Sequence, residues 1–322
     1  MENSRLNIFP QVVPPFISIP HCFGAEKRFS LRIRFLAGRL LAVACFSCLV
    51  LMDRADGHGA YHDVVEAISA ELKKKPDDAA LHYRLAEAHA GHEEWQACLE
   101  EIKTVERLAP GGYPTGFLRG LALHGEGKEE EAKQSLDVFL VGNPGHVQAL
   151  ATRGRVFLKL GLAPEAMADL QKAVDLSTTP ETDLITDLAI ACRDAGKPAE
   201  ASKVIDAGLK TAGNSPDLLQ CALGIETSAG LWDAALGRIA ALQQTAPRPE
   251  PWMARRAELL QTAGRPDEAR AAWTALRAHL LSLPNLERGT PLLRGILAQT
   301  EKALGNNSPP PVIAVPASPP KS

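Results

Sequence analysis

The feature that most constrains this chain is a Gly followed five residues later by an Ala, a pair that returns about every 34 residues. The pairs are Gly127 and Ala132, Gly161 and Ala166, Gly196 and Ala201, Gly230 and Ala235, and Gly264 and Ala269. Each Gly lies 34 residues after the previous one, except for one step of 35 between Gly161 and Gly196. A period of this length is typical of helical repeats that stack into a solenoid. The sequence therefore predicts a repeat array.

When each unit is numbered so that this Gly is position 15, small and large residues fall at fixed places. Position 8 holds mostly small residues, and position 20 holds only small residues. Position 24 holds only large apolar residues. The residues at position 20 are Cys98, Ala132, Ala166, Ala201, Ala235 and Ala269, and those at position 24 are Ile102, Leu136, Leu170, Ile205, Ile239 and Trp273. Two helices approach closely only where their side chains are small. The pattern predicts two antiparallel helices per unit, with positions 8 and 20 at their crossing.

Position 15 lies between the two helices, where Gly supplies the positive φ that ends the first one. Glu93 occupies this position in the first unit, so we expect that turn to be less regular than the others. We expect the extra residue of the 35-residue step in the loop near Thr179 and Pro180.

This pattern resembles the tetratricopeptide repeat (TPR) family over about six units, from Ala79 to roughly Leu281. The residues that fit the family are Leu85, Gly154, Phe157, Ala166, Ala173 and Pro144. The resemblance implies an all-α fold, a right-handed superhelical solenoid of antiparallel helix pairs. Arg119, Arg153 and Arg256 depart from the family's Leu at position 7, and we expect these positions to be shifted or to face solvent.

We divide the chain into five segments. Residues 1–57 are a leader or N-terminal anchor, 58–76 a capping helix, and 77–283 about six TPR units. Residues 284–305 are a second capping helix, in which Thr290 precedes an apolar stripe of Leu292, Leu293, Ile296, Leu297 and Leu304. The tail, residues 306–322, contains six prolines and is expected to be extended or disordered.

The leader contains a 13-residue apolar run, Leu40 to Met52, behind five Lys and Arg residues. Such a basic stretch before a short apolar run is typical of a secretory signal, and the run is short for a membrane span of about 20 residues. Ala55 is a candidate for the last residue removed, but Asp53 is a poor residue for a cleavage site. An uncleaved membrane anchor is the alternative. Both interpretations predict export, to the periplasm or beyond, or anchoring in the inner membrane.

The charge and motifs of the remaining chain exclude several functions. Residues 58–304 contain 27 Lys and Arg against 34 Asp and Glu, and such an acidic body argues against nucleic-acid binding. No phosphate-binding loop, dinucleotide fingerprint or nucleophile elbow occurs. Cys98, Cys192 and Cys221 are expected to be core residues, since cysteine often behaves as a small hydrophobe. We therefore expect no enzymatic activity and no cofactor.

The TPR resemblance implies that the first helices line a concave groove. The groove residues that we select are Tyr83, Phe117, Leu121, His124, Arg155, Lys159 and Arg193. The first two units supply an aromatic and apolar patch, and the middle two supply a basic patch. This combination suits an extended peptide with an acidic group. We therefore expect a non-catalytic scaffold that binds a protein or peptide in the groove and is exported to the cell envelope.

Two alternatives come from the N-terminal region. If Leu40 to Met52 stays in the mature protein, the chain is a membrane-tethered assembly factor. If His58 and His62 share one helix face, they could bind a metal ion in an accessory protein. The stretch from His58 to His62 resembles the mature start of exported bacterial TPR proteins, but no further ligand completes a metal site, so a capping segment is favoured. His82 and His89 are expected to pack in the core.

Sequencing of the mature N-terminus distinguishes a cleaved leader from an anchor. We expect the purified protein to begin close to His58. A protein that begins at Met1 and does not associate with membranes would contradict export.

Overall fold

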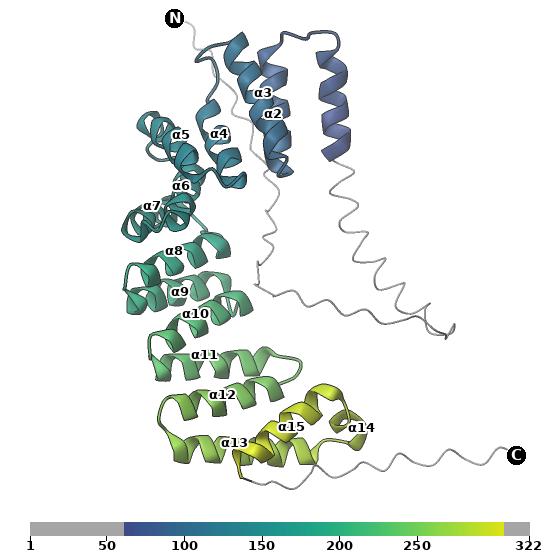
Figure 1. Ribbon diagram of the computed structural model, residues 1–322, viewed down its shortest axis with the longest axis vertical. Helices are drawn as coiled ribbons and strands as arrows, with labels where there is room; N and C mark the ends of the chain where they lie inside the picture. The colour runs from purple at the N-terminus through teal and green to yellow at the C-terminus, as the bar shows by residue number, and fades with distance from the viewer. Residues whose placement is uncertain (1–60, 306–322) are drawn as a thin grey trace, which may run out of the picture. The chain divides into compact units, whose positions relative to one another are not determined.

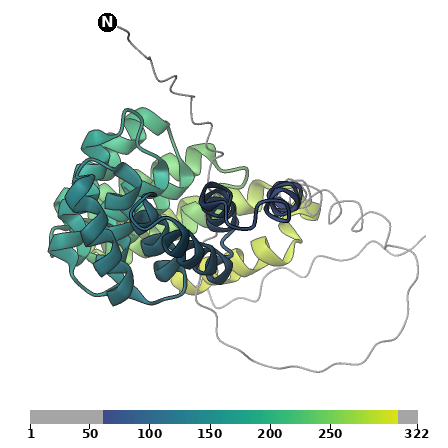
Figure 2. The same cartoon turned by 90° about the horizontal axis from the view of Figure 1, so that it is seen from above.

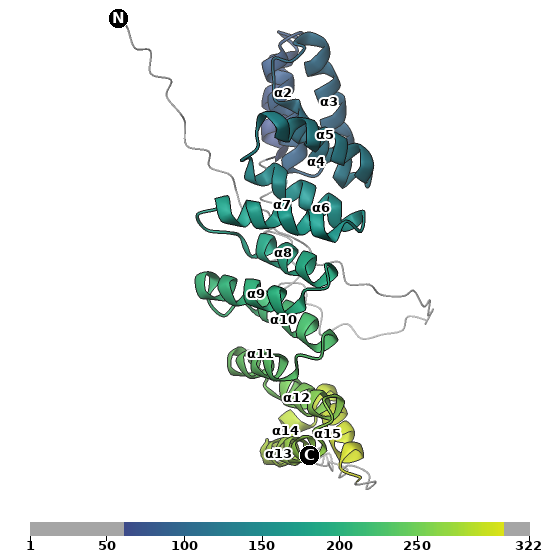
Figure 3. The ribbon, with the colours of Figure 1, turned by 90° about the vertical axis from the view of Figure 1, so that its left-hand side faces the viewer.

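The computed structural model describes residues 61–305, and their regular structure is entirely helical. Residues 61–72 form a helix, and six helix pairs follow it (Figures 1 and 3). The first helices are α2 (Ala79–Gly91), α4 (Thr115–Gly125), α6 (Val147–Lys159), α8 (Thr182–Asp194), α10 (Pro216–Ser228) and α12 (Glu250–Thr262). The second helices are α3 (Trp95–Leu108), α5 (Glu129–Gly142), α7 (Ala163–Leu176), α9 (Pro198–Ala212), α11 (Trp232–Thr245) and α13 (Pro266–Ser282). The short α14 (Asn285–Arg288) and α15 (Pro291–Ala303) end the described part. The predicted all-α solenoid of helix pairs is confirmed.

The two helices of a unit touch at the predicted positions. A Cβ atom built on Gly120 would lie 2.5 Å from Cγ of Leu136, and one built on Gly154 would lie 2.5 Å from Cγ of Leu170. Position 8 therefore faces position 24, and in these two units only Gly leaves room for the leucine. All six side chains at position 24 are at most 2% exposed, and burying an aliphatic side chain of this size stabilises a fold by about 1.5–3 kcal/mol.

The turn between the two helices has the same backbone conformation in all six units. Its five glycines have φ between 71° and 76°, and Glu93 has φ of 63°. The amide of Glu94 donates to the carbonyl of His89 at 2.9 Å, as the amide of Lys128 does to Leu123 at 2.8 Å. The prediction that the first turn is less regular was therefore wrong. Its hydrogen bonds fix the shape, and Glu93 tolerates a conformation that favours Gly.

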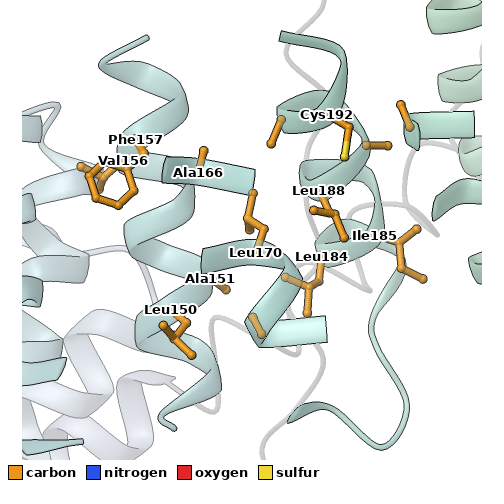
Figure 4. Close-up of a cluster of buried hydrophobic side chains, with 14 of the residues drawn as sticks. Leu150, Ala151, Val156, Phe157, Ala166, Leu170, Leu184, Ile185, Leu188 and Cys192 are labelled. Carbon is orange, nitrogen blue, oxygen red and sulfur yellow. The ribbon is translucent and has the colours of Figure 1, made fainter. Parts of the chain in front are cut away.

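Successive units stack mainly because the second helix of each unit packs on the first helix of the next: α3 contacts α4, α5 contacts α6, α7 contacts α8, α9 contacts α10, and α11 contacts α12. Neighbouring first helices from α2 to α10 also touch one another. Figure 4 shows this stacking in the middle of the array, where Leu170 of α7 lies between the side chains of α6 and those of α8, including Leu184. The loop from α7 to α8 spans residues 177–181, one residue longer than the loop from α5 to α6, so the 35-residue step is accommodated there.

Ion pairs join neighbouring units on the side of the second helices. Nε of Arg153 donates to Asp169 of its own unit at 2.6 Å, and its Nη1 donates to Asp137 of the preceding unit at 2.8 Å. Arg119 likewise pairs with Glu106 of the preceding unit. The expectation that position 7 is shifted or faces solvent was therefore wrong for both arginines. The helix register is kept, and arginine is long enough to reach a carboxylate on the neighbouring unit.

The helix of residues 61–72 lies beside α2 (Figure 2), and Ile68 packs against Leu81 and Leu85. Tyr61 Oη lies 2.9 Å from Nδ1 of His89, which is half-buried, and burial lowers the pKa of this histidine.

The apolar stripe of α15 and the buried cysteines were also predicted from the sequence. In α15, Leu293, Ile296 and Leu297 are buried, whereas Leu292 is 55% exposed, so its placement in the buried stripe was wrong. The three cysteines within residues 61–305 are free, and Cys98 and Cys192 are buried.

Replacing Glu93 by Gly should stabilise the first unit. The left-handed conformation is strained for Glu, so we expect the free energy of unfolding to rise by about 0.5–1 kcal/mol in urea titrations followed by circular dichroism. The matched control is Gly127→Ala, where the added Cβ meets nothing within 4 Å and only the backbone is strained. It should lower the unfolding free energy by about 1 kcal/mol. A loss of stability in Glu93→Gly would contradict this account of the turn.

Candidate functional site

The residues predicted to bind a partner all lie on first helices, and we call the surface that they share the first-helix face. Tyr83 belongs to α2, and Arg193 belongs to α8. The others are Phe117, Leu121 and His124 on α4, and Arg155 and Lys159 on α6. These four helices contact one another in order, so the seven residues lie on adjacent helices.

The N-terminal end of the first-helix face is aromatic. The ring of Tyr83 stacks on that of Tyr113, with centroids 5.2 Å apart and planes inclined by 26°. Tyr113 also lines a hollow of about 510 Å³ with the loop of residues 75–80. The repeat register did not single out Tyr113, because it is the first position of its unit and falls in a loop when α4 begins at Thr115. The Gly111-Gly112 pair before it, a helix-breaking signal, indicated this late start.

A carboxylate adjoins this aromatic pair. Burial raises the pKa of Tyr83 to about 12, and the nearby negative charge of Glu87 adds to the rise. Burial also raises the pKa of Glu87 itself. A partly desolvated carboxylate beside two aromatic rings suits a ligand group that donates hydrogen bonds or is positively charged.

The three predicted residues of α4 mainly hold the helices together. The ring of Phe117 lies 6.1 Å from that of Phe139 and 4.9 Å from that of His146, so it packs between α4, α5 and the start of α6. Nδ1 of His124 lies 2.7 Å from a carboxylate oxygen of Glu129, which begins α5. Leu121 is half-buried beside the aromatic end. The predicted apolar patch is therefore narrower on the surface than the sequence suggested.

Two of the three predicted cations form ion pairs. Nε of Arg155 lies 2.5 Å from Asp187 of the next first helix, and Nε of Arg193 lies 2.7 Å from Asp194. Lys159 is exposed and forms no ion pair within residues 61–305. Asp187 was missed because it stands outside the expected groove positions, and only stacking of α8 on α6 brings it beside Arg155. The basic patch thus has less net charge than its three cations imply.

His58 and the run from Leu40 to Met52 lie outside the described residues. His62 is exposed, and no group of three His, Cys, Asp or Glu side chains suited to a metal ion occurs from residue 61 to residue 305. Among the helices of this same range, none is long and apolar enough to cross a bilayer.

Comparison with solved structures identifies the fold. The C-terminal part of a TPR repeat-containing protein from Cytophaga hutchinsonii is 14% identical and matches with a TM-score of 0.55, over 70% of this chain and 93% of that one. A tetratricopeptide repeat protein from Parabacteroides merdae is 16% identical, with a TM-score of 0.49 over 77% and 95% of the two chains. PilF of Pseudomonas aeruginosa is 13% identical, with a TM-score of 0.47 over 69% and 97%.

Searches by sequence gave no corresponding match: no family model matches the chain, and no curated protein does. The structural match nevertheless confirms the TPR resemblance at the level of the fold. The described residues form a TPR array.

Truncating Phe117 and Lys159 should separate packing residues from surface residues on this face. We expect Phe117→Ala to lower the unfolding free energy by about 2–4 kcal/mol, because it empties a site shared by three helices. Lys159→Ala should change it by less than about 0.5 kcal/mol, because its side chain is exposed and without an ion pair. Equal effects in chemical denaturation would contradict these assignments.

Proposed function

We propose that this protein is a non-catalytic interaction scaffold that binds a protein or peptide along the first-helix face. The observation that carries the proposal is the continuity of this face. Four successive first helices contact one another, and exposed or half-buried side chains of different chemistry follow one another along them. Such an extended surface suits a segment that contacts several units at once.

The two ends of the first-helix face differ in charge, and this gives the bound segment a direction. Tyr83, Tyr113 and Glu87 form an aromatic and acidic end, whereas Lys159, Arg155 and Arg193 form a cationic end. We propose that an aromatic or basic side chain of the partner packs at the first end and that an acidic group binds at the second.

The ion pairs of the cationic end leave room for such an acidic group. Arg155 uses Nε to bind Asp187, and Arg193 uses Nε to bind Asp194. A guanidinium has five N–H donors in a planar fork, so both arginines keep donors for a ligand carboxylate. Lys159 adds a point charge with no competing carboxylate within residues 61–305. The cationic end is therefore suited to bidentate recognition of a carboxylate, in spite of its modest net charge.

The location that we propose is the cell envelope. This part of the proposal rests on the basic stretch and the apolar run within residues 1–57. It also favours a test in which partners are taken from the envelope fraction of the native cells.

Charge reversal on the first-helix face tests the proposal. The variant Arg155→Glu, Lys159→Glu, Arg193→Glu should lose the partners captured from the envelope fraction, while the helical circular dichroism stays unchanged. The matched control reverses three lysines of second helices, in the variant Lys172→Glu, Lys203→Glu, Lys210→Glu, and makes the same change in net charge. These lysines are exposed, so the control should fold and keep its partners.

Three results would overturn this proposal. Partners that remain bound to the first variant would show that the cationic end is not used. Partners lost equally from both variants would show a general charge effect. If the wild-type protein captures no partner that the triple variant lacks, the proposed scaffold function of this face is contradicted.

A further inference from the structure

The described array begins with an unpaired second helix. Ile68 lies 34 residues before Ile102 and therefore has position 24, and Val64 likewise has position 20. The helix of residues 61–72 thus has the register of a second helix, and it packs against α2 as a second helix packs against the next unit. No first helix from residues 61–305 covers its other side: Val64 is 46% exposed, whereas position 20 is at most 1% exposed in all six complete units.

The array ends with an unpaired first helix. α15 has 13 residues, like α12, and Gly305 follows it at the same distance as Gly264 follows α12, with φ of 77°. Gly305 therefore marks position 15, and Ala298 has position 8. The helix packs against α12 and α13 as the first helix of a seventh unit. Ala298 is exposed, although position 8 is buried in every complete unit.

The chain after Gly305 is poorly suited to supply the second helix of this unit. Six of the 17 residues from Asn306 to Ser322 are proline. Proline in a helix interior removes a hydrogen bond and clashes with the preceding turn, at a cost of about 3 kcal/mol each. Residues 306–322 therefore lack the composition of a second helix.

We propose that copies of this protein associate head to tail, so that α15 of one copy and the helix of residues 61–72 of the next form a composite TPR unit. One end supplies a first helix without a second, and the other end supplies a second helix without a first. Ala298 and Val64, both exposed, would then lie where positions 8 and 20 lie in each complete unit, whereas Ile68 is already buried against α2. This proposal does not depend on the function proposed for the first-helix face.

Charges at the two ends are complementary in this arrangement. Within a unit, position 4 faces position 27, since a Cβ built on Gly116 would lie 3.1 Å from Cβ of Phe139. The corresponding residues of the composite unit are Arg294 and Glu71. Both are exposed, and neither forms an ion pair in the described part of the chain. Their opposite charges favour this pairing of ends and disfavour two like ends.

The composite unit would be a small interface. One helix pair buries less surface than the about 1,200–2,000 Å² of a stable complex, so the association should be weak and should depend on concentration. A head-to-tail contact also leaves one free end on each side, so longer chains of copies can form.

Sedimentation velocity of the purified full chain over a wide concentration range tests the proposal. The weight-average mass should rise with concentration for the wild-type protein. Val64→Arg and Ala298→Arg should each abolish this rise, because each blocks one end at an exposed position where the fold is not disturbed. Ala207→Arg, at an exposed alanine in the middle of α9, should leave the association unchanged.

The decisive experiment mixes the Val64→Arg variant with the Ala298→Arg variant. The open α15 end of Val64→Arg should pair with the open N-terminal helix of Ala298→Arg, so the mixture should form dimers but nothing larger. In a second arm, Arg294→Glu and Glu71→Arg should each weaken the association of wild-type ends, and a chain with both changes should recover it.

Four outcomes would overturn the proposal. The first is a wild-type protein that is monomeric at all concentrations, and the second is self-association that both blocking variants leave unchanged. The third is the absence of dimers in the mixture. The fourth is a Val64→Arg variant that loses thermal stability while the wild type is monomeric. The last outcome would show that another segment of the same chain covers the N-terminal helix.

Discussion

The close approach of two helices within each unit is the constraint on which the rest of the structure depends. A small residue at position 8 lets position 24 of the second helix reach the axis of the first, and the left-handed residue at position 15 sets the angle at which the second helix returns. Five of the six complete units have Ala or Gly at position 8, with Leu223 in the fifth, and all six have the left-handed residue, so successive units present similar faces to one another. The stacking of successive units, and with it the row of first helices, follows from this one contact.

At the two ends of the described array, the positions of the helix crossing are exposed. Each complete unit buries both sides of its crossing, whereas Val64 and Ala298 expose the same positions at the first and last described helices. Arrays of this kind need ends with a polar outer face to remain separate. Here Val64 and Ala298 are small or apolar, and the opposite charges of Glu71 and Arg294 lie near them, as the proposed head-to-tail association requires.

The first-helix face combines residues of two kinds that only their contacts distinguish. The side chains of Phe117 and His124 contact neighbouring helices, and Arg155 of α6 forms an ion pair with Asp187 of α8. Tyr83, Tyr113, Glu87 and Lys159 are the side chains more available to a partner. A face of this composition is suited to directional binding of an extended segment, with structural residues fixing the spacing of the groups that would make contact.

The sequence by itself determined the all-helical fold, the unit length, the residues at the helix crossing and the helices on which the candidate site lies. It could do so because these features repeat, and a requirement imposed on local backbone and helix packing recurs at a fixed spacing. Only the tertiary structure decided that Glu93 adopts the glycine conformation, that Arg153 bridges two units, that Tyr113 joins the aromatic end, and that Asp187 neutralises part of the basic patch. The last three depend on side chains from different units, whose distance apart is set by stacking, whereas the conformation of Glu93 is fixed by the backbone hydrogen bonds of its own turn.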